Sequence, residues 1–162
     1  MEPQFRPATA GDTDRLVGLM REYYAFDRID FDEPWAREAL GRLLADPALG
    51  RAWLIEWEGQ VAGYLFLTFG YSLEYKRDAF LDELYVCAPL RGRGIGRKAV
   101  EHVVAACPAL GIAALHLVVV PGNERARRLY ESLGFEDEQR RMLTRRLERP
   151  PRRPDPAAAA RD

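Results

Sequence analysis

The sequence predicts a single α/β domain, in which strands and one-sided helices interleave along the chain. Two observations support this prediction. Residues 80–87 are rich in Leu, Tyr, Phe and Val and lead into a glycine-rich turn, and apolar residues then recur at helical spacing from Ile95 to Cys107. The length of 162 residues and the hydrophobic content of 48% suffice for one core. We therefore expect one domain over residues 1–148.

Upstream of the glycine-rich turn, the pattern predicts two helices followed by a hairpin. A short strand at residues 4–6 precedes a helix that begins near Gly11-Asp12-Thr13, and a second helix covers residues 33–45. Asp46-Pro47 and Gly50 then mark the way into strands at 52–56 and 61–69, joined at Glu58-Gly59.

Downstream, the sequence predicts a turn and a buried strand that ends near Val120, a helix at residues 124–132, and a last hairpin within 136–148. Residues 149–162 are biased toward proline and alanine and offer little to bury, so we expect a flexible tail outside the fold.

Charge is distributed unevenly between the two halves of the chain. Residues 1–90 hold 16 acidic and 9 basic side chains, a net −7, whereas residues 91–162 hold 9 acidic and 15 basic side chains, a net +6. An acidic half suits a cationic acceptor and a basic half suits an anionic cofactor, because each field raises the local concentration of its ligand. With a pI of about 6.2 and no basic stripe interleaved with aromatic residues, nucleic acid is a poor partner.

Cysteine and histidine are too few to build a metal site or a disulfide framework. The chain has two cysteines, Cys87 and Cys107, and two histidines, His102 and His116, with no cluster around any of them. We expect inert thiols, no metal, no membrane span and a cytoplasmic protein, since a signal-like apolar segment is missing from the first residues.

The segment Arg91-Gly92-Arg93-Gly94-Ile95-Gly96 predicts an anion site, because it lies directly between a strand and a helix. Backbone N–H groups at a helix start are unpaired, the helix dipole is positive there, and glycine lets the main chain come close to a phosphate. Arginine adds paired hydrogen bonds to phosphate oxygens. A dinucleotide fingerprint is excluded because Arg97 stands where its third glycine would fall, and a Walker loop is excluded because Ala99 follows Lys98.

Two motifs together resemble the GNAT superfamily of N-acetyltransferases. They are Arg91-x-x-Gly94-x-Gly96 after Leu84-Tyr85-Val86, and Asn123-x-x-Ala126-x-x-Leu129-Tyr130-x-x-x-Gly134-Phe135. The resemblance implies a mixed, mostly antiparallel twisted sheet flanked by helices, with splayed central strands that hold coenzyme A. The spacing around the first motif is similar to that of the polyamine (spermidine/spermine) members. Members often pair through C-terminal strands, so the resemblance also implies a homodimer.

The resemblance implies that acetyl-CoA is the co-substrate and that it is held mainly by the first motif. The residues implied in cofactor binding are Leu84, Tyr85, Val86, Arg91, Gly92, Arg93, Gly94, Ile95, Gly96, Arg97, Asn123 and Arg127. A backbone N–H near Val86 would stabilise the oxyanion of the thioester, and Tyr130 would protonate the departing thiolate, a task that a phenol with a pKa near ~10 suits.

The acceptor amine needs a proton acceptor, because an alkylamine with a pKa near ~10.4 is mostly protonated at neutral pH. Asp82 and Glu83 are the candidates. Asp82 matches the acidic residue of the polyamine-type members, and Glu83 points to the opposite face of an ideal strand. A bulge in this strand, usual in the family, would change which of the two faces the cleft.

The acceptor itself is expected near a group of carboxylates and aromatic rings, which attract ammonium groups. These residues are Tyr24, Asp27, Asp30, Asp32 and Glu33, with Tyr71 and Glu74 as a second group. The favoured function is acetyl transfer to a small-molecule primary amine, polyamine-like or an amino acid, by direct attack in a ternary complex. Two alternatives stay open: a protein N-terminal or lysine acetyltransferase, and a catalytically silent acyl-CoA binding module.

Overall fold

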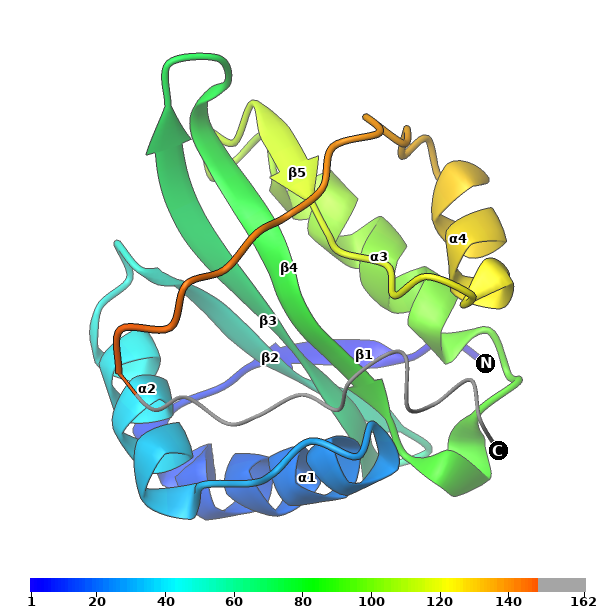
Figure 1. Ribbon diagram of the computed structural model, residues 1–162. Coiled ribbons are helices and arrows are strands. Elements are labelled where there is room, and N and C mark those ends of the chain that lie inside the picture. Colours follow the sequence, from blue (N-terminus) through cyan, green and yellow to red (C-terminus); the bar gives the residue numbers. More distant parts are fainter. Residues whose placement is uncertain (149–162) are drawn as a thin grey trace.

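The computed structural model describes residues 1–148, and its centre is one five-stranded twisted sheet in the order β1-β2-β3-β4-β5 (Figure 1). The first four strands are antiparallel: β1 (Gln4–Pro7), β2 (Gly50–Trp57), β3 (Gln60–Ser72) and β4 (Lys76–Val86). The last strand, β5 (Ala114–His116), runs parallel to β4. Both the predicted α/β class and the mixed, mostly antiparallel sheet are confirmed.

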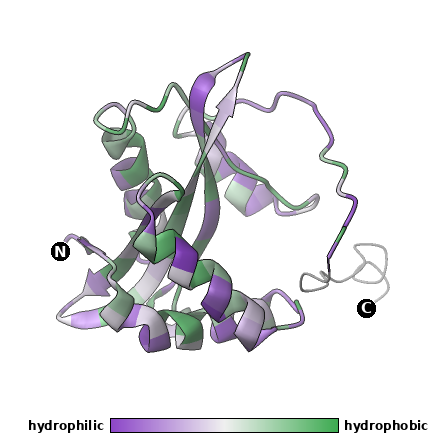
Figure 2. Cartoon of the chain, turned by 90° about the vertical axis from the view of Figure 1, so that its left-hand side faces the viewer, coloured by the Kyte–Doolittle hydropathy of each residue, from purple (hydrophilic) through white to green (hydrophobic). Residues whose placement is uncertain are grey.

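Helices cover both faces of this sheet, and a separate hydrophobic core lies on each face. On one face, α1 (Thr13–Phe26) and α2 (Glu33–Ala45) pack against β2, β3 and β4. On the other face lie α3 (Ile95–Ala106) and α4 (Glu124–Glu131), together with the chain that leads into β5. We call the core under α1 and α2 the α1 core, and the core under α3 and α4 the α3 core. Along the helices at the front of Figure 2, hydrophilic and hydrophobic residues alternate, as expected when one side of a helix meets a sheet.

The elements upstream of the glycines form where the sequence places them. Helix α2 has the predicted bounds, and its start is capped by Asp32, whose Oδ1 accepts the Trp35 N–H at 3.0 Å. The β2–β3 hairpin turns at Glu58 and Gly59, whose φ values of 52° and 75° are typical of a tight two-residue turn. Strand β4 begins earlier than predicted, because it pairs with the long strand β3 as far as Ser72↔Lys76.

A β-bulge in β4 decides which side chains reach which face of the sheet. Phe66 is opposite Glu83 and Leu67 is opposite Leu81, so Asp82 is the extra residue. Before the bulge, Leu81 packs in the α3 core, and after it Tyr85 packs in the α1 core. Because side chains alternate along a strand, one extra residue moves Glu83 to the α1 face.

Strands β4 and β5 separate after a short paired stretch. Their pairing covers Asp78–Phe80 against Ala114–His116, and beyond it the chain diverges from β4 toward α4 (Figure 1). The part of β4 at residues 81–86 therefore has β3 on one edge and, within residues 1–148, no paired strand on the other. We call this divergence of β4 from the chain after β5 the fork. It confirms the splayed strands that the family resemblance implied.

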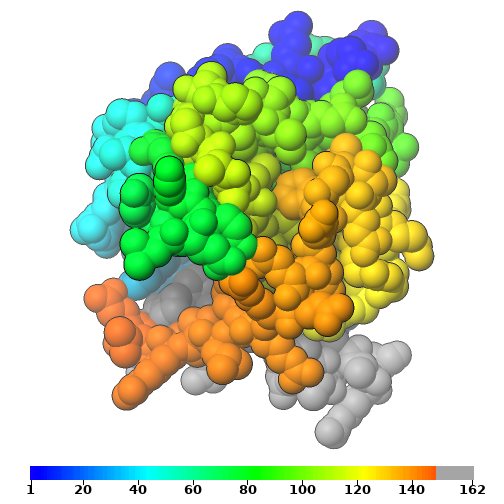
Figure 3. Space-filling model, turned by 90° about the horizontal axis from the view of Figure 1, so that it is seen from above, coloured from blue at the N-terminus to red at the C-terminus, as the bar shows by residue number. Residues whose placement is uncertain are grey.

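Two expectations for the C-terminal third are wrong. The predicted buried strand up to Val120 is only three residues long, and Val118 and Val120 are 60% and 51% exposed. Residues 136–148 form no hairpin, and Leu143 is 91% exposed. The alternation there is too weak to define a buried face, and the segment is held by ion pairs instead. Arg140 binds Glu74 in the β3–β4 turn, and in Figure 3 the earlier, orange part of this segment lies beside that green turn. The predicted tail at 149–162 lies outside the described residues.

His102 on α3 is a half-buried titratable group beside the α3 core. Its ring stacks on Phe5 at 4.4 Å and meets the edge of Trp53 at 5.5 Å, and its Nε2 is buried without a hydrogen-bond partner. Burial lowers the pKa of His102.

This depressed pKa predicts acid sensitivity of the fold. Below about pH 6.5 the unfolded chain protonates His102 more readily than the folded chain does, so the free energy of unfolding falls as the pH drops from there. Urea unfolding at pH 7.5, 6.5 and 5.5 measures this slope. We expect the His102→Phe variant, which keeps the stacked ring, to be the less pH-sensitive protein over that window. An identical slope in both proteins would assign the acid sensitivity to other groups.

Candidate active site

The glycine segment forms an open cradle at the start of α3. Gly92 and Gly94 both have φ of 80°, a left-handed conformation that L side chains rarely adopt, and Gly94 is the N-cap of α3. Cβ atoms built at Gly92, Gly94 or Gly96 would meet nothing within 4 Å. This open space next to unpaired helix N–H groups fits the phosphates of coenzyme A.

The basic residues near the cradle differ in the groups that they contact. Arg91 turns back toward α1: its guanidinium lies 4.0 Å from the centre of the Phe26 ring, and its Nε donates to the Val86 carbonyl at 2.9 Å. Arg97 donates to Ser132 of the segment after α4 at 2.7 Å, and Arg127 binds Glu124 and Glu131. Arg93 is exposed beside Gly92 and Gly94.

The edge of β4 offers backbone donors to the fork. The Cys87 N–H donates to the Ala62 carbonyl of β3 at 2.8 Å. Because N–H groups alternate between the two edges of a strand, those of Leu84 and Val86 point away from β3, into the fork. The side chains of Leu84 and Val86 pack against the α3 core, whereas Tyr85 is buried on the α1 face and donates its hydroxyl to Glu22 at 3.1 Å.

Glu83 is the carboxylate at the centre of the acceptor side. Its Oε1 accepts the hydroxyl of Tyr24 from α1 at 2.8 Å, and its Oε2 accepts the hydroxyl of Tyr64 from β3 at 2.7 Å. Burial raises the pKa of both tyrosines, and the charge of Glu83 raises them further. Both phenols therefore stay protonated, and each donates a hydrogen bond to the carboxyl group of Glu83.

Asp82 is more exposed than Glu83, and its charge contributes to the raised pKa of Tyr24. Because the bulge puts an extra residue of β4 opposite β3, the strict alternation that would send Asp82 and Glu83 to opposite faces of an ideal strand is lost here. Both Asp82 and Glu83 interact with neighbouring groups.

Tyr130 lies on the other side of β4. It packs against the α3 core, to which Leu84 and Val86 also belong, and its ring meets Phe135 edge-on at 5.8 Å. Burial raises the pKa of Tyr130, so its phenol keeps a transferable proton. Helix α4, which carries it, is capped by Asn123, whose side chain accepts the Ala126 N–H at 3.1 Å.

Of the predicted acceptor residues, Tyr24 is the one that contacts Glu83. Asp27 ends α1, Asp32 caps α2, and Asp30 lies exposed between the two helices. Glu33 is held by Arg21 and, at 2.9 Å, by Arg37, which lowers its pKa. These pairs offset the charge of Glu33, so this carboxylate is less available to a ligand than the composition of the loop indicates.

Tyr71 and Glu74 lie at the far end of the β3–β4 ribbon. Tyr71 pairs with Arg77 and is 77% exposed, and Glu74 binds Arg140 at 3.0 Å. At about 3.3 Å per residue, Arg77 lies roughly 20 Å along β4 from Glu83. The structure therefore does not bring this second group together with the carboxylates.

The wall around Glu83 includes Tyr64, which the sequence did not predict and which donates to Glu83. Tyr23 and Phe31, aromatic residues from the same stretch of sequence as the predicted Tyr24, contact Tyr24 with ring centres at 5.6 Å and 5.3 Å. One signal for Tyr64 was present, because it lies in a mainly apolar strand and a buried phenol normally needs a hydrogen-bond partner. Its partner could not be found without the register of β3 and β4.

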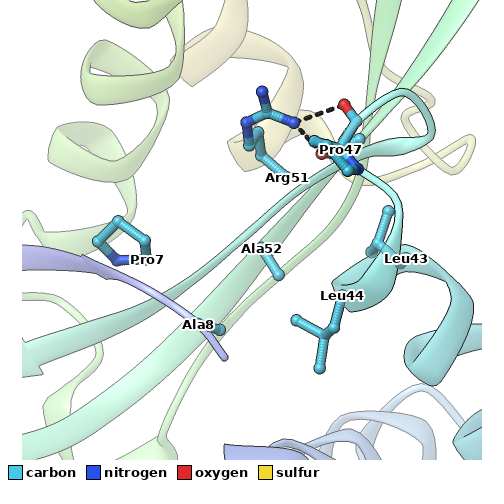
Figure 4. A pocket seen from close by; sticks show the side chains of 8 residues that line it. Pro7, Ala8, Leu43, Leu44, Pro47, Arg51 and Ala52 are labelled. Carbon is cyan, nitrogen blue, oxygen red and sulfur yellow. Dashed lines mark hydrogen bonds between the residues drawn. The ribbon is translucent and has the colours of Figure 1, made fainter. Parts of the chain in front are cut away.

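A separate small pocket lies away from this site (Figure 4). It is lined by Pro7, Ala8, Leu43, Leu44, Pro47, Gly50, Arg51 and Ala52, between the end of β1 and the exit of α2. Arg51 at its rim already donates to the carbonyls of Pro47 and Gly50, at 2.6 Å and 2.7 Å. No charged side chain in it is aimed at an empty space, so it adds nothing to the chemistry.

A domain with a splayed β4–β5 fork, a glycine cradle on α3 and a phenol on α4 is typical of acyl-CoA-dependent N-acetyltransferases. The Acetyltransferase (GNAT) family model matches residues 16–135, and the chain belongs to this family. The family transfers an acetyl group from acetyl-CoA to an amine, so the protein is an acyltransferase.

Known relatives agree with this membership. The thialysine N-epsilon-acetyltransferase of Bos taurus is 29% identical over 148 residues, covering 82% of this chain and 83% of that one. The D-amino-acid N-acetyltransferase HPA3 of Saccharomyces cerevisiae is 27% identical over 132 residues, covering 79% and 81%. Among solved structures, an integron cassette protein from a salt-marsh metagenome superposes with a TM-score of 0.81 at 35% identity, covering 91% and 92%.

Two further findings concern what residues 1–148 lack. No helix in that range is both long enough and apolar enough to cross a membrane. The same residues contain no cluster of His, Cys, Asp and Glu with the makings of a metal site.

The cradle predicts that Gly94→Glu abolishes acetyl-CoA binding. The substitution puts a side chain and a negative charge where phosphate would lie, and it strains a residue with φ of 80°. Isothermal titration with acetyl-CoA measures the effect, which we expect to exceed a hundredfold in Kd. Gly41→Glu, on the exposed side of α2, is the matched control and should bind as the parent does. Undiminished binding by Gly94→Glu would place the cofactor elsewhere.

Proposed function

We propose that the protein acetylates a primary amine of a small molecule, by direct attack on acetyl-CoA in a ternary complex, with Glu83 as the proton acceptor. The observation that supports this most is the position of Glu83. Its carboxyl group accepts two phenols on the α1 face of β4, and the fork lies at the edge of β4 that is not paired with β3. Tyrosine and phenylalanine rings next to it favour an ammonium group.

The first chemical requirement is removal of a proton from the acceptor. An alkylammonium group has no lone pair for attack, and transfer of its proton to Glu83, directly or through water, frees one. Asp82 adds negative charge and thereby stabilises the cation before it is deprotonated. The amine nitrogen then forms a bond to the carbonyl carbon of the thioester.

The second requirement is stabilisation of the thioester as it breaks. The Val86 N–H points into the fork and can donate to the carbonyl oxygen as negative charge builds there. When the carbon–sulfur bond breaks, Tyr130 donates its phenol proton to the departing sulfur. As the new carbon–nitrogen bond forms, the nitrogen loses its second proton to solvent, and solvent returns a proton to the Tyr130 phenolate. The proton first taken by Glu83 is also released to solvent, so the products are an N-acetyl amine, coenzyme A and one proton.

The relatives support a small acceptor. Thialysine and D-amino acids are the substrates in the names of two relatives that this chain matches over about four fifths of its length. Both are small molecules with a primary amine. A primary-amine panel of thialysine, lysine, D-amino acids, polyamines and short peptides, assayed by thiol release from acetyl-CoA, tests the proposal. Turnover confined to the peptides would favour a protein acetyltransferase, and tight acetyl-CoA binding with no turnover on a broad panel would favour a silent binding module.

Neutralising Glu83 and neutralising Asp82 should reduce the acetyltransferase activity to different extents. Glu83→Gln removes the proton acceptor, so we expect kcat to fall by about a hundredfold or more at pH 7.5. Asp82→Asn removes a more exposed charge and should mainly raise the KM of the amine, by about three- to tenfold. Steady-state kinetics with the best amine of the panel measure both, and a larger kcat loss in Asp82→Asn would exchange the two roles.

Removing the hydroxyl of Tyr130 should lower kcat and leave the affinity for acetyl-CoA almost unchanged. Tyr130→Phe keeps the ring that packs beside Phe135 but removes the proton donor, so we expect kcat to fall by about tenfold to a hundredfold. The Kd of acetyl-CoA, measured by titration, should stay within about twofold. An unchanged kcat across pH 6 to 9 would remove Tyr130 from the mechanism.

A further inference from the structure

The carboxylate of Glu83 is clamped from two different elements, one phenol on each oxygen. Tyr24 comes from α1 and Tyr64 from the neighbouring strand β3, with oxygen–oxygen distances of 2.8 Å and 2.7 Å. Hydrogen bonds to an ionised acceptor are about twice as strong as neutral ones. We call Tyr24, Glu83 and Tyr64 the clamp.

The two phenols differ in their access to water. Tyr64 has no exposed area, and its ring is packed against Phe66 at 4.7 Å and Tyr85 at 6.0 Å, so its hydroxyl has a fixed position. Tyr24 is half-buried near the surface, between Tyr23 and Phe31. Water can replace the hydroxyl of Tyr24 on Glu83 much more easily than that of Tyr64.

Packing alone does not account for a tyrosine at this position. Phenylalanine would fill the same space in the core without a polar atom, and a buried hydroxyl costs free energy unless it is hydrogen-bonded. The hydroxyl of Tyr64 has Glu83 as its partner. The group that gains most from this bond is the carboxylate, because it is held ionised and in one orientation.

Titratable groups from three elements lie around the clamp. They are Tyr23 and Tyr24 from α1, Tyr64 from β3, and Asp82 and Tyr85 from β4 itself. Of these, Tyr85 donates its hydroxyl to Glu22, and on α2 Glu33 is paired with Arg21 and Arg37. Each oxygen of Glu83 accepts one phenol.

We propose that Tyr64 is a positioning residue for the acetyl transfer: its buried hydroxyl keeps Glu83 ionised and oriented toward the acceptor amine. This inference rests on the proposed role of Glu83 as the proton acceptor. Tyr64 itself touches neither substrate and acts through the carboxylate. Tyr24 supports the other oxygen and shares that oxygen with water and with the arriving amine.

A carboxyl titration followed by NMR tests the clamp without any substrate. In protein labelled with 13C-glutamate, the Glu83 carboxyl signal is assigned by its loss in Glu83→Gln, and its midpoint is measured in each variant. Hydrogen bonds to a carboxylate favour its charged form, so Tyr64→Phe should raise the midpoint by about one pH unit. Tyr24→Phe should raise it less, because water takes the vacant place. Tyr75→Phe, which removes a hydroxyl bound to Glu138 at the far end of the β3–β4 ribbon, is the matched control and should leave it unmoved.

Kinetics then separate positioning from packing. Tyr64→Phe should lower kcat by about tenfold, with less than about a twofold change in the KM of the amine, and should move the acidic limb of the kcat/KM profile to higher pH. The same substitution in a Glu83→Gln background should have almost no effect on kcat, because the group through which it acts is gone.

The outcomes are distinct. An equal loss of kcat in both backgrounds, with an unmoved Glu83 midpoint, would overturn the clamp and make Tyr64 a packing residue, while the proposed function would stand. A raised midpoint together with no turnover of any amine would support the clamp and refute the proposed function. If Tyr64→Phe does not fold, the NMR signal of the Tyr64 Cζ carbon in the parent protein tests the contact instead. A pH-dependent shift of that signal with the same midpoint as the Glu83 carboxyl supports the contact. A shift that does not follow the Glu83 midpoint contradicts it.

Discussion

The bulge at Asp82 in β4 is the constraint on which the candidate site depends. A strand alternates its side chains between two faces, so a regular β4 would put Glu83 into the apolar core beneath α3, with Ala79 and Leu81. The extra residue moves Glu83 to the α1 face, where two phenols receive it, and leaves Leu84 and Val86 against α3. One inserted residue therefore places Glu83, the proposed proton acceptor, on one face of β4, while the side chains of Leu84 and Val86, proposed for the cofactor side, lie on the other face.

This separation gives the two cores different roles. The α3 core is almost wholly apolar, and it positions the glycine cradle, the edge of β4 and Tyr130. The α1 core contains Tyr64 and Tyr85 among its aliphatic residues, and each phenol donates to a carboxylate, Glu83 or Glu22. The polar groups of the acceptor side are thus built into a core, where burial fixes their geometry.

Net charge turned out to be a weaker guide to the acceptor site than individual contacts. The acidic N-terminal half predicted a cationic acceptor, but many of its carboxylates are paired with arginines, as Asp12 is with Arg6 and Glu33 is with Arg37. Such pairs are exposed and contribute little beyond mutual neutralisation. Glu83 differs from these carboxylates in accepting two phenol hydroxyls, from Tyr24 and Tyr64, which carry no charge.

The sequence by itself determined the class of the protein and located the glycine segment and Tyr130, which we propose for the cofactor side. The glycines, the arginines and Tyr130 belong to local motifs, and local motifs keep their meaning because their residues are adjacent in the chain. The helix bounds followed for the same reason, since caps and periodicity are local. Asp82 and Glu83 were named from the sequence, but their directions were not.

Only the tertiary structure decided the direction of Glu83, its partners, and the fate of the C-terminal third. Tyr64 and Glu83 are 19 residues apart and Tyr24 and Glu83 are 59 apart, so their contact depends on strand register and helix docking, which no local pattern encodes. The weak alternation after Phe135 likewise looked like a hairpin, but it has no buried face to define a register. The segment is joined to the β3–β4 turn by the Arg140–Glu74 ion pair and the hydrogen bond from Tyr75 to Glu138. Local residues determine local structure, whereas a site made from distant elements is determined by packing.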